Sequence, residues 1–272
     1  MPACLYRYAL GLSIFMALVC GLRYSAAQAQ VFAPTPQADA NAETPDNGGL
    51  NDEDDPQVLE PPKLPDPPDA KRLSKQDRVW VDAKHRQVIV DGAISLREGY
   101  LEMFACIQGT KEHESIVAVR SRAATVHAAL LAVGAVPGRP VSYSPDFHPP
   151  SGTEIGVDVH WMDEQKKWHK ARAQDWIRDL KTKKPMTQPW VFAGSGFWVD
   201  EKSGKNYYMA EAGDLICVSN FTTAMMDVPI ESSHENDALS FEANPAGIPP
   251  MGMPVRLVLT PKLKPEDAKS KP

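Results

Sequence analysis

The sequence predicts an α+β domain in which antiparallel β-sheet predominates and one or two helices accompany it. Three observations lead to this class. Short stretches of alternating apolar and polar residues recur along the chain, turn signals separate them, and a single segment repeats its apolar residues with helical spacing. The sequence has no convincing internal repeat of the kind that solenoids and propellers show.

The strand pattern begins near Arg78. Residues 79–90 are typical of two short strands joined by a turn at 83–86, and the segments 94–97 and 101–106 continue the pattern. We therefore expect the first part of the sheet to come from this region.

The period then changes to that of a helix. Ser121 is placed to cap its N-terminus, and Gly134 followed by Pro137 is expected to end it. Apolar residues recur at helical spacing at Val126, Leu130 and Val133.

Strands return after this helix. Val157, Val159 and Trp161 alternate with polar residues, which is typical of a half-buried strand. A turn at 201–205 is expected to join two strands into a hairpin. The remaining strands are expected within 168–177, 190–198, 207–209, 215–218 and 255–259.

Composition excludes several functional classes. The chain has 272 residues, of which 43% are hydrophobic and 24% charged, as in a globular protein rather than a disordered or collagen-like chain. Its formal net charge of −6 lacks the basic surplus of a nucleic-acid binder, so we expect no nucleic-acid partner. The sequence contains no phosphate-binding loop or dinucleotide fingerprint, so we expect no nucleotide cofactor.

The N-terminus has the three parts of a secretory signal peptide. Arg7 precedes an apolar stretch at 9–22, and Ala-Gln-Ala at 27–29 provides a small-residue cleavage site. An uncleaved anchor is the alternative, but the stretch is shorter than the roughly 20 residues of a membrane span. We expect residues 1–29 to be removed, leaving a periplasmic or extracellular protein without a transmembrane span.

Charge and proline content divide the rest of the chain. Residues 30–70 hold nine prolines in 41 positions and carry ten acids against one lysine. We expect 30–77 to be an acidic, Pro-rich disordered linker, because such a segment repels itself and has few residues that build a core. The domain is expected at 78–263 and a flexible tail at 264–272.

Removal of the leader would leave two cysteines, Cys106 and Cys217. A disulfide between them would close a long loop and stabilise the fold by roughly 4–5 kcal/mol in the chain-entropy model. Two buried thiols, or one functional thiol, are the alternatives.

Four sequence blocks lie at 101–106, 109–119, 127–134 and 213–221, and the last reads Gly-Asp-Leu-Ile-Cys-Val-Ser-Asn-Phe. Together they resemble the YdjY-like domain of exported bacterial proteins, of which long versions occur in planctomycetes. The resemblance covers about residues 78–263. It implies a periplasmic or envelope location and supplies no activity.

Some proteins of this family are described as ferredoxin-like, which the cysteine count tests. An iron–sulfur cluster is commonly held by four thiolates. Two cysteines separated by more than a hundred residues remain after the leader. We therefore expect no Cys4 iron–sulfur cluster.

Cys106, His113 and Glu114 are the candidate catalytic residues. A thiolate and an imidazole also bind metals, so Cys106 and His113 are candidate metal ligands if a residue such as His127 returns in space. The metalloprotease motif H-E-x-x-H is incomplete, because Val117 stands where its second histidine belongs. Cys106 as a nucleophile with His113 as its base is a further hypothesis. A structural histidine and a buried or disulfide-bonded cysteine are the alternatives.

Aromatic residues suggest a different activity. Six tryptophans and the pair Tyr207-Tyr208 are candidates for a platform that stacks against sugars, although aromatics in strands also fill cores.

We therefore expect an exported module that binds a component of the cell envelope and has no established chemistry. The alternative is a metal- or thiol-dependent enzyme centred on Cys106 and His113.

Overall fold

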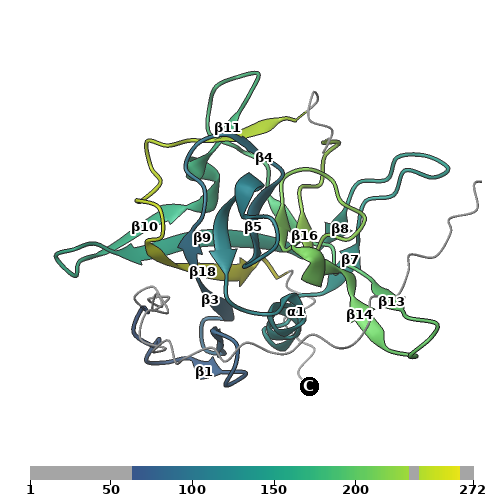
Figure 1. Cartoon of the computed structure of the whole chain (residues 1–272), viewed down its shortest axis with the longest axis horizontal. Helices are drawn as coiled ribbons and strands as arrows, with labels where there is room; N and C mark the ends of the chain where they lie inside the picture. Colours follow the sequence, from purple (N-terminus) through teal and green to yellow (C-terminus); the bar gives the residue numbers. More distant parts are fainter. Residues whose placement is uncertain (1–62, 233–238, 264–272) are drawn as a thin grey trace, which may run out of the picture. The chain divides into compact units, whose positions relative to one another are not determined.

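Eight strands close into a barrel (Figure 1). The computed structural model describes residues 63–232 and 239–263. The predicted leader, most of the predicted linker and the predicted tail lie outside these residues.

The described chain is rich in β-structure and contains one α-helix. The strands are β1 (Lys71–Arg72), β2 (Val79–Asp82), β3 (Gln87–Ile94), β4 (Tyr100–Leu101), β5 (Met103–Ile107), β6 (Ser115–Val119), β7 (Pro137–Arg139), β8 (Ser151–Gly152), β9 (Glu154–Met162), β10 (Trp168–Arg172), β11 (Ile177–Asp179), β12 (Trp190–Phe192), β13 (Phe197–Val199), β14 (Asn206–Tyr208), β15 (Ile216–Cys217), β16 (Met226–Asp227), β17 (Phe241–Ala243) and β18 (Pro254–Pro261). The helices are α1 (Ala123–Ala132) and the 3₁₀-helices η1 (Glu112–Glu114), η2 (Ala173–Trp176) and η3 (Met209–Ala212). The β-rich architecture agrees with the predicted class, whereas closure into a barrel was not predicted.

The barrel has the strand order β3–β18–β9–β12–β16–β15–β5–β6, and β6 pairs with β3 to close it. The pairs β5–β6 and β15–β16 are parallel, and the other pairs of the barrel are antiparallel. At the closure, a Cβ atom on Gly92 would lie 2.6 Å from the carbonyl oxygen of Ala118. Glycine therefore permits the close approach of β3 and β6.

The expected alternation is clearest in β9. Ile155, Val157 and Val159 are buried, whereas Asp158 and His160 between and after them are partly exposed. This period of two places one row of side chains inside the barrel. β10 pairs with β9 from Trp168 onward and lies within the segment 168–177, in which a strand was expected.

The core combines aromatic and aliphatic side chains from both halves of the chain. The Phe104 ring lies 5.6 Å from the Trp190 ring and 6.4 Å from the Trp176 ring, measured between centroids. Trp190 also donates a hydrogen bond of 2.8 Å from Nε1 to the carbonyl oxygen of Cys217. This bond satisfies the one polar atom of a fully buried ring.

The helix α1 buries Ala123, Val126, Ala129 and Leu130. Gly134 has a φ of +93°, the left-handed conformation that commonly ends helices, so the predicted C-terminal end is confirmed.

The prediction that Ser121 caps α1 is wrong. Arg122 occupies the N-cap position without a side-chain cap, and the carboxylate of Glu211 accepts hydrogen bonds from the amides of Ala123 (3.0 Å) and Ala124 (2.9 Å). The capping group comes from η3, far away in sequence, so the local pattern contained no sign of it.

Ordered structure begins before Arg78. β1 pairs with β2, and Leu64 is buried. The guanidinium groups of Arg78 and Arg256 bind the carbonyl oxygens of Leu64 and Pro65, each at 2.8 Å, and both also bind the Asp91 carboxylate. These bonds attach part of the segment expected to be linker to the barrel.

Candidate functional site

Two regions depart from the usual separation of polar surface and apolar core. We call the first the acid–thiol cluster, which comprises Glu102, Cys106, Lys111, Glu114, Asp214, Cys217 and Asp227. We call the second the aromatic hairpin, which comprises β13, β14 and the turn between them.

Lys111 and Asp214 join two of the blocks that resemble the family. The Lys111 ammonium lies 2.9 Å from the Asp214 carboxylate, whose side chain is 5% exposed. It also lies 4.3 Å from the centre of the Phe221 ring. Burial lowers the pKa of Lys111, but the hydrogen bond and charge of Asp214 outweigh burial, so the pKa is raised overall. Lys111 is therefore charged at neutral pH.

Glu102 and Glu114 form a carboxyl pair beside Lys111. Burial, together with the charge of Glu114 and the hydrogen bond between the two groups, raises the pKa of Glu102 to about 7. The Lys111 ammonium lies 4.0 Å from the Glu114 carboxylate and partly offsets this effect. The pair is therefore poised to hold or release one proton near neutrality.

Asp227 is the most deeply buried acid of the cluster. Burial raises its pKa to about 8, although its carboxylate accepts hydrogen bonds from the amides of Val228 (2.8 Å) and Phe221 (3.2 Å). The carboxyl group is therefore largely neutral at pH 7.

Cys106 and Cys217 are both free, fully buried and part of one small apolar cluster with Met103, Ala118 and Ala224. Their strands pair, but Cys217 lies opposite Met103 rather than Cys106. Burial raises the pKa of both thiols, which lowers the fraction of the reactive thiolate. Of the three alternatives left open by the sequence, the structure therefore contains two buried thiols.

His113 lies at the edge of the acid–thiol cluster. Its side chain is 77% exposed, and its Nε2 atom lies 3.6 Å from the Glu114 carboxylate. Glu114 thus lies beside Glu102 and Lys111, whereas His113 points largely to solvent.

His127 lies in a separate aromatic contact. Its Nδ1 atom is 2.8 Å from the Tyr208 hydroxyl, and its ring packs edge-on against Phe192 at 4.8 Å. Burial lowers its pKa. Within residues 63–232 and 239–263, no group of three His, Cys, Asp or Glu side chains is arranged to hold a metal ion.

The aromatic hairpin exposes large apolar side chains. Phe197 is 67% exposed, Trp198 56%, Val199 51% and Tyr207 47%. Trp198 and Tyr207 lie opposite each other on the two strands, with ring centroids 5.5 Å apart and ring planes tilted by 34°. The hairpin is one of the outer projections in Figure 1. Its strands β13 and β14 form a two-stranded sheet of their own. It confirms the predicted turn at 201–205.

Tyr208 anchors this hairpin to the barrel. Its hydroxyl donates a hydrogen bond of 3.0 Å to the carbonyl oxygen of Gly194 and meets His127 on α1. A Cβ atom on Gly194 would lie 2.8 Å from Pro137, so a glycine is needed at this contact. His127, a candidate metal ligand, thus contacts Tyr208, the residue that anchors the hairpin.

Sequence reasoning missed Glu102, Lys111 and Asp227 and gave Asp214 no role. The available signal was their position. Glu102, Lys111 and Asp214 lie in three of the blocks that resemble the family, and Asp227 is the last residue of the short strand β16. A charged residue next to a buried strand is a sign of a paired or functional group.

None of the described helices is both long and apolar enough to cross a membrane. No curated protein and no solved structure matches the chain. The family model of the YdjY domain matches residues 79–260. This range includes the acid–thiol cluster, the aromatic hairpin and all eight barrel strands except Pro261, the last residue of β18. Because this match covers more than half of the sequence, the chain belongs to the YdjY domain family.

Proposed function

We propose that this protein is exported and binds a saccharide component of the cell envelope through the aromatic hairpin. The observation that carries the proposal is the exposure of four large apolar side chains on two adjacent three-residue strands. Exposed apolar patches of this kind mark interaction sites, because the chain itself leaves their surface in water.

The composition of the hairpin favours a saccharide. Sugar rings carry a face of C–H groups, which packs against the flat face of an indole or phenol ring. Trp198 and Tyr207 provide two such rings side by side. The turn adds Asp200, Lys202 and Lys205, which are able to hydrogen-bond sugar hydroxyls.

Export is the second part of the proposal. It is supported by the signal-peptide pattern of residues 1–29 and by membership of the YdjY domain family. Mass spectrometry of the chain purified from its producing cells is expected to find Gln30 as the first residue. An intact chain with Met1 in the cytosol would contradict export.

Calorimetric titration tests the binding. The probe is a soluble β-1,4-linked tetrasaccharide of N-acetylglucosamine, added to the full chain. The double variant Trp198→Ala/Tyr207→Ala removes both rings. It is expected to weaken binding at least about tenfold, which corresponds to roughly 1.4 kcal/mol. Tyr100→Ala is the matched control, because Tyr100 is 60% exposed on a different strand. Equal binding by the double variant and the wild type would refute the proposal.

The alternative enzyme centred on Cys106 and His113 has weaker support. The Cys106 thiol is buried with a raised pKa, and His113 is turned to solvent. Elemental analysis of protein purified without a metal-binding tag distinguishes the two functions. Stoichiometric metal that is lost in His113→Ala would favour the enzyme.

A further inference from the structure

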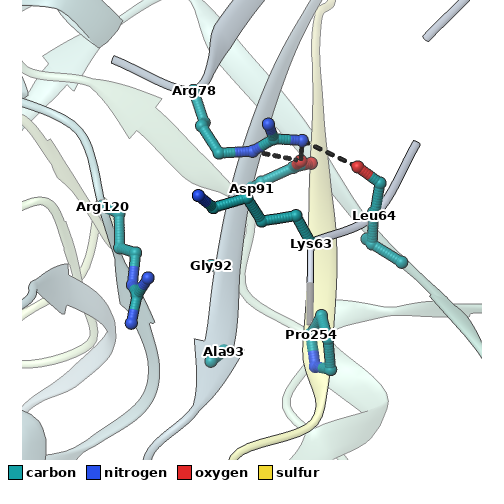
Figure 2. Close-up of a pocket in the computed structure, with 8 residues that line it drawn as sticks. All are labelled: Lys63, Leu64, Arg78, Asp91, Gly92, Ala93, Arg120 and Pro254. Atoms are coloured by element: carbon teal, nitrogen blue, oxygen red, sulfur yellow. Dashed lines mark hydrogen bonds and ion pairs between the residues drawn. The ribbon is translucent and has the colours of Figure 1, made fainter. Parts of the chain in front are cut away.

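Arg120 lies where three hollows of the surface meet. It follows β6 directly and precedes α1, and its side chain is half-buried. One hollow also borders Lys63 and Pro254, a second borders Asp77 and Gly109, and a third borders Ser95 and Glu112. Figure 2 shows the first, with Arg120 facing it from the side opposite Pro254.

Arg120 has no hydrogen-bond or ion-pair partner in the described chain, and no dashed line reaches it in Figure 2. Every other arginine that the structure describes as at least partly buried donates to a carboxylate or a carbonyl oxygen. These are Arg72, Arg78, Arg97, Arg178 and Arg256. The other arginines without a partner, Arg86 and Arg139, are exposed. Arg120 is thus the described arginine that loses water contacts without gaining a protein acceptor.

The carboxylates that line the same hollows are engaged elsewhere. Asp91 accepts hydrogen bonds from Arg78 and Arg256, and Asp77 accepts from Arg122 and Thr125. The Glu112 carboxylate accepts a hydrogen bond from the Gly109 amide. Within the described residues, the positive charge of Arg120 therefore has no carboxylate in direct contact. The acids that line the same hollows already accept hydrogen bonds from other donors.

We propose that Arg120 binds the carboxylate of a small organic monoanion. A guanidinium group presents paired N–H donors in the geometry that a carboxylate accepts, and partial burial strengthens such a charge-assisted pair. One unpaired cation balances one negative charge. Lys63, Arg78 and Arg122 also line these hollows, but each is engaged with another group, and Arg78 and Arg122 neutralise Asp91 and Asp77. Arg120 therefore adds one positive charge, which the single charge of a carboxylate matches. A phosphate dianion would bring a second negative charge close to Asp77, Asp91 and Glu112.

The size and lining of the hollows indicate where the rest of the ligand lies. The hollow beside Lys63 and Pro254 has a volume of about 30 Å³, which admits little more than a water molecule. The hollow beside Asp77 and Gly109 has about 450 Å³, but the charged pair of Asp77 and Arg122 borders it. The hollow beside Ser95 and Glu112 has about 240 Å³ and is also lined by the apolar residues Ile94 and Ala118. It has room for a short aliphatic or peptide-like body attached to the carboxylate.

Arginine side-chain NMR on the full chain tests this site. The probe is acetyl-Ala-Ala, which carries one carboxylate, and its C-terminal amide and inorganic phosphate are the comparison ligands. The acid is expected to shift the Nε–Hε signal of Arg120 in a saturable manner, the amide is expected to leave it unchanged, and phosphate is expected to bind more weakly than the acid.

Variants complete the test. Arg120→Gln is expected to weaken binding of the acid at least about tenfold, as the loss of a charge-assisted contact predicts. Arg120→Lys, which keeps the charge but loses the paired donors, is expected to bind with intermediate affinity. Arg139→Gln is the matched control and is expected to bind like the wild type.

Three results would overturn the inference: no saturable shift of the Arg120 signal, equal binding by Arg120→Gln, or tighter binding of phosphate than of the acid. The inference is independent of the proposed saccharide site. Trp198→Ala/Tyr207→Ala is expected to bind the acid like the wild type, so the two proposals fail separately.

Discussion

Charged side chains usually lie on the surface of a protein and aromatic ones in its core. The acid–thiol cluster and the aromatic hairpin depart from this arrangement in opposite ways. The cluster buries charged and polar groups, and the hairpin exposes aromatic ones. The buried Asp214 carboxylate has Lys111 as its partner, and the buried Asp227 carboxyl accepts two backbone amides. No residue of the described chain buries the exposed faces of Trp198 and Phe197.

This difference separates stability from binding. A buried charge such as that of Asp214 stabilises the surrounding strands only while its partner is present, and removal of the partner is expected to lower the free energy of unfolding. An apolar surface that is exposed to water contributes little to the stability of the fold, so a binding partner better explains why it is exposed. We therefore expect substitutions in the cluster to affect folding and substitutions in the hairpin to affect binding.

The largest expected effect is that of Lys111→Met. It leaves Asp214 buried beside the Glu102–Glu114 pair without its cation, and we expect it to lower the free energy of unfolding by about 3 kcal/mol. Urea unfolding measures this change. The matched control is Lys183→Met, since Lys183 also pairs with a carboxylate but is 60% exposed, and its loss is expected to cost less than about 1 kcal/mol. Equal losses in the two variants would show that the cluster does not stabilise the fold.

The second effect is a dependence of stability on pH. The pKa of Glu102 is raised to about 7 in the folded chain, so the folded state holds more protons than the unfolded state between about pH 4.5 and 7. This group therefore destabilises the fold increasingly as the pH rises through that window. Asp227, whose pKa burial raises to about 8, acts in the same direction as Glu102. His127 and His160, whose pKa values are lowered by burial, act in the opposite direction.

The variant Glu102→Gln isolates the contribution of Glu102, because Asp227 and both histidines are unchanged in it. We expect its stability relative to the wild type to increase by roughly 1–3 kcal/mol between pH 5 and pH 8. Urea unfolding at several pH values measures the difference. A constant difference across this range would contradict the raised pKa.

The third effect concerns the anchor of the hairpin. Tyr208→Phe removes the hydroxyl that binds Gly194 and His127, and we expect a loss of about 1–2 kcal/mol. Tyr207→Phe, the adjacent exposed residue, is expected to change the free energy of unfolding by less than about 0.5 kcal/mol. If both variants unfold alike, the hydroxyl does not hold the hairpin to the barrel.

The smallest expected effect on stability is that of Trp198→Ala/Tyr207→Ala. These rings bury little surface against the chain, so we expect a loss of at most about 1.5 kcal/mol from their cross-strand contact. Thermal unfolding measures it. A loss as large as that of Lys111→Met would mean that the hairpin is part of the core.

Much of the fold could be predicted from local pattern. The alternation in β9, the turn between β2 and β3, the end of α1 at Gly134 and the turn of the aromatic hairpin all depend on neighbouring residues. Closure of the barrel could not be predicted, because it depends on the pairing of β3 with β6 and on the space around Gly92. The cap of α1 by Glu211 was hidden for the same reason.

The candidate site was predicted only in part. Glu114 lies beside Lys111, the charged group that pairs with Asp214 and that the search for catalytic motifs passed over. Cys106 is a buried free thiol, and His113 is largely exposed. The suggested aromatic platform included Tyr207, which is exposed, and Tyr208, which is buried and anchors the hairpin instead. Sequence alone also could not tell that Trp198 is exposed while Trp190 is fully buried. Both are aromatic residues in short strands, and only tertiary packing separates them.

Fluorine NMR of the chain labelled with 5-fluorotryptophan tests the central claim most directly. The account predicts that the N-acetylglucosamine tetrasaccharide shifts the Trp198 signal in a saturable manner and leaves the signals of the buried Trp80, Trp176 and Trp190 in place. A Trp198 signal that stays unchanged as the saccharide is added would contradict it.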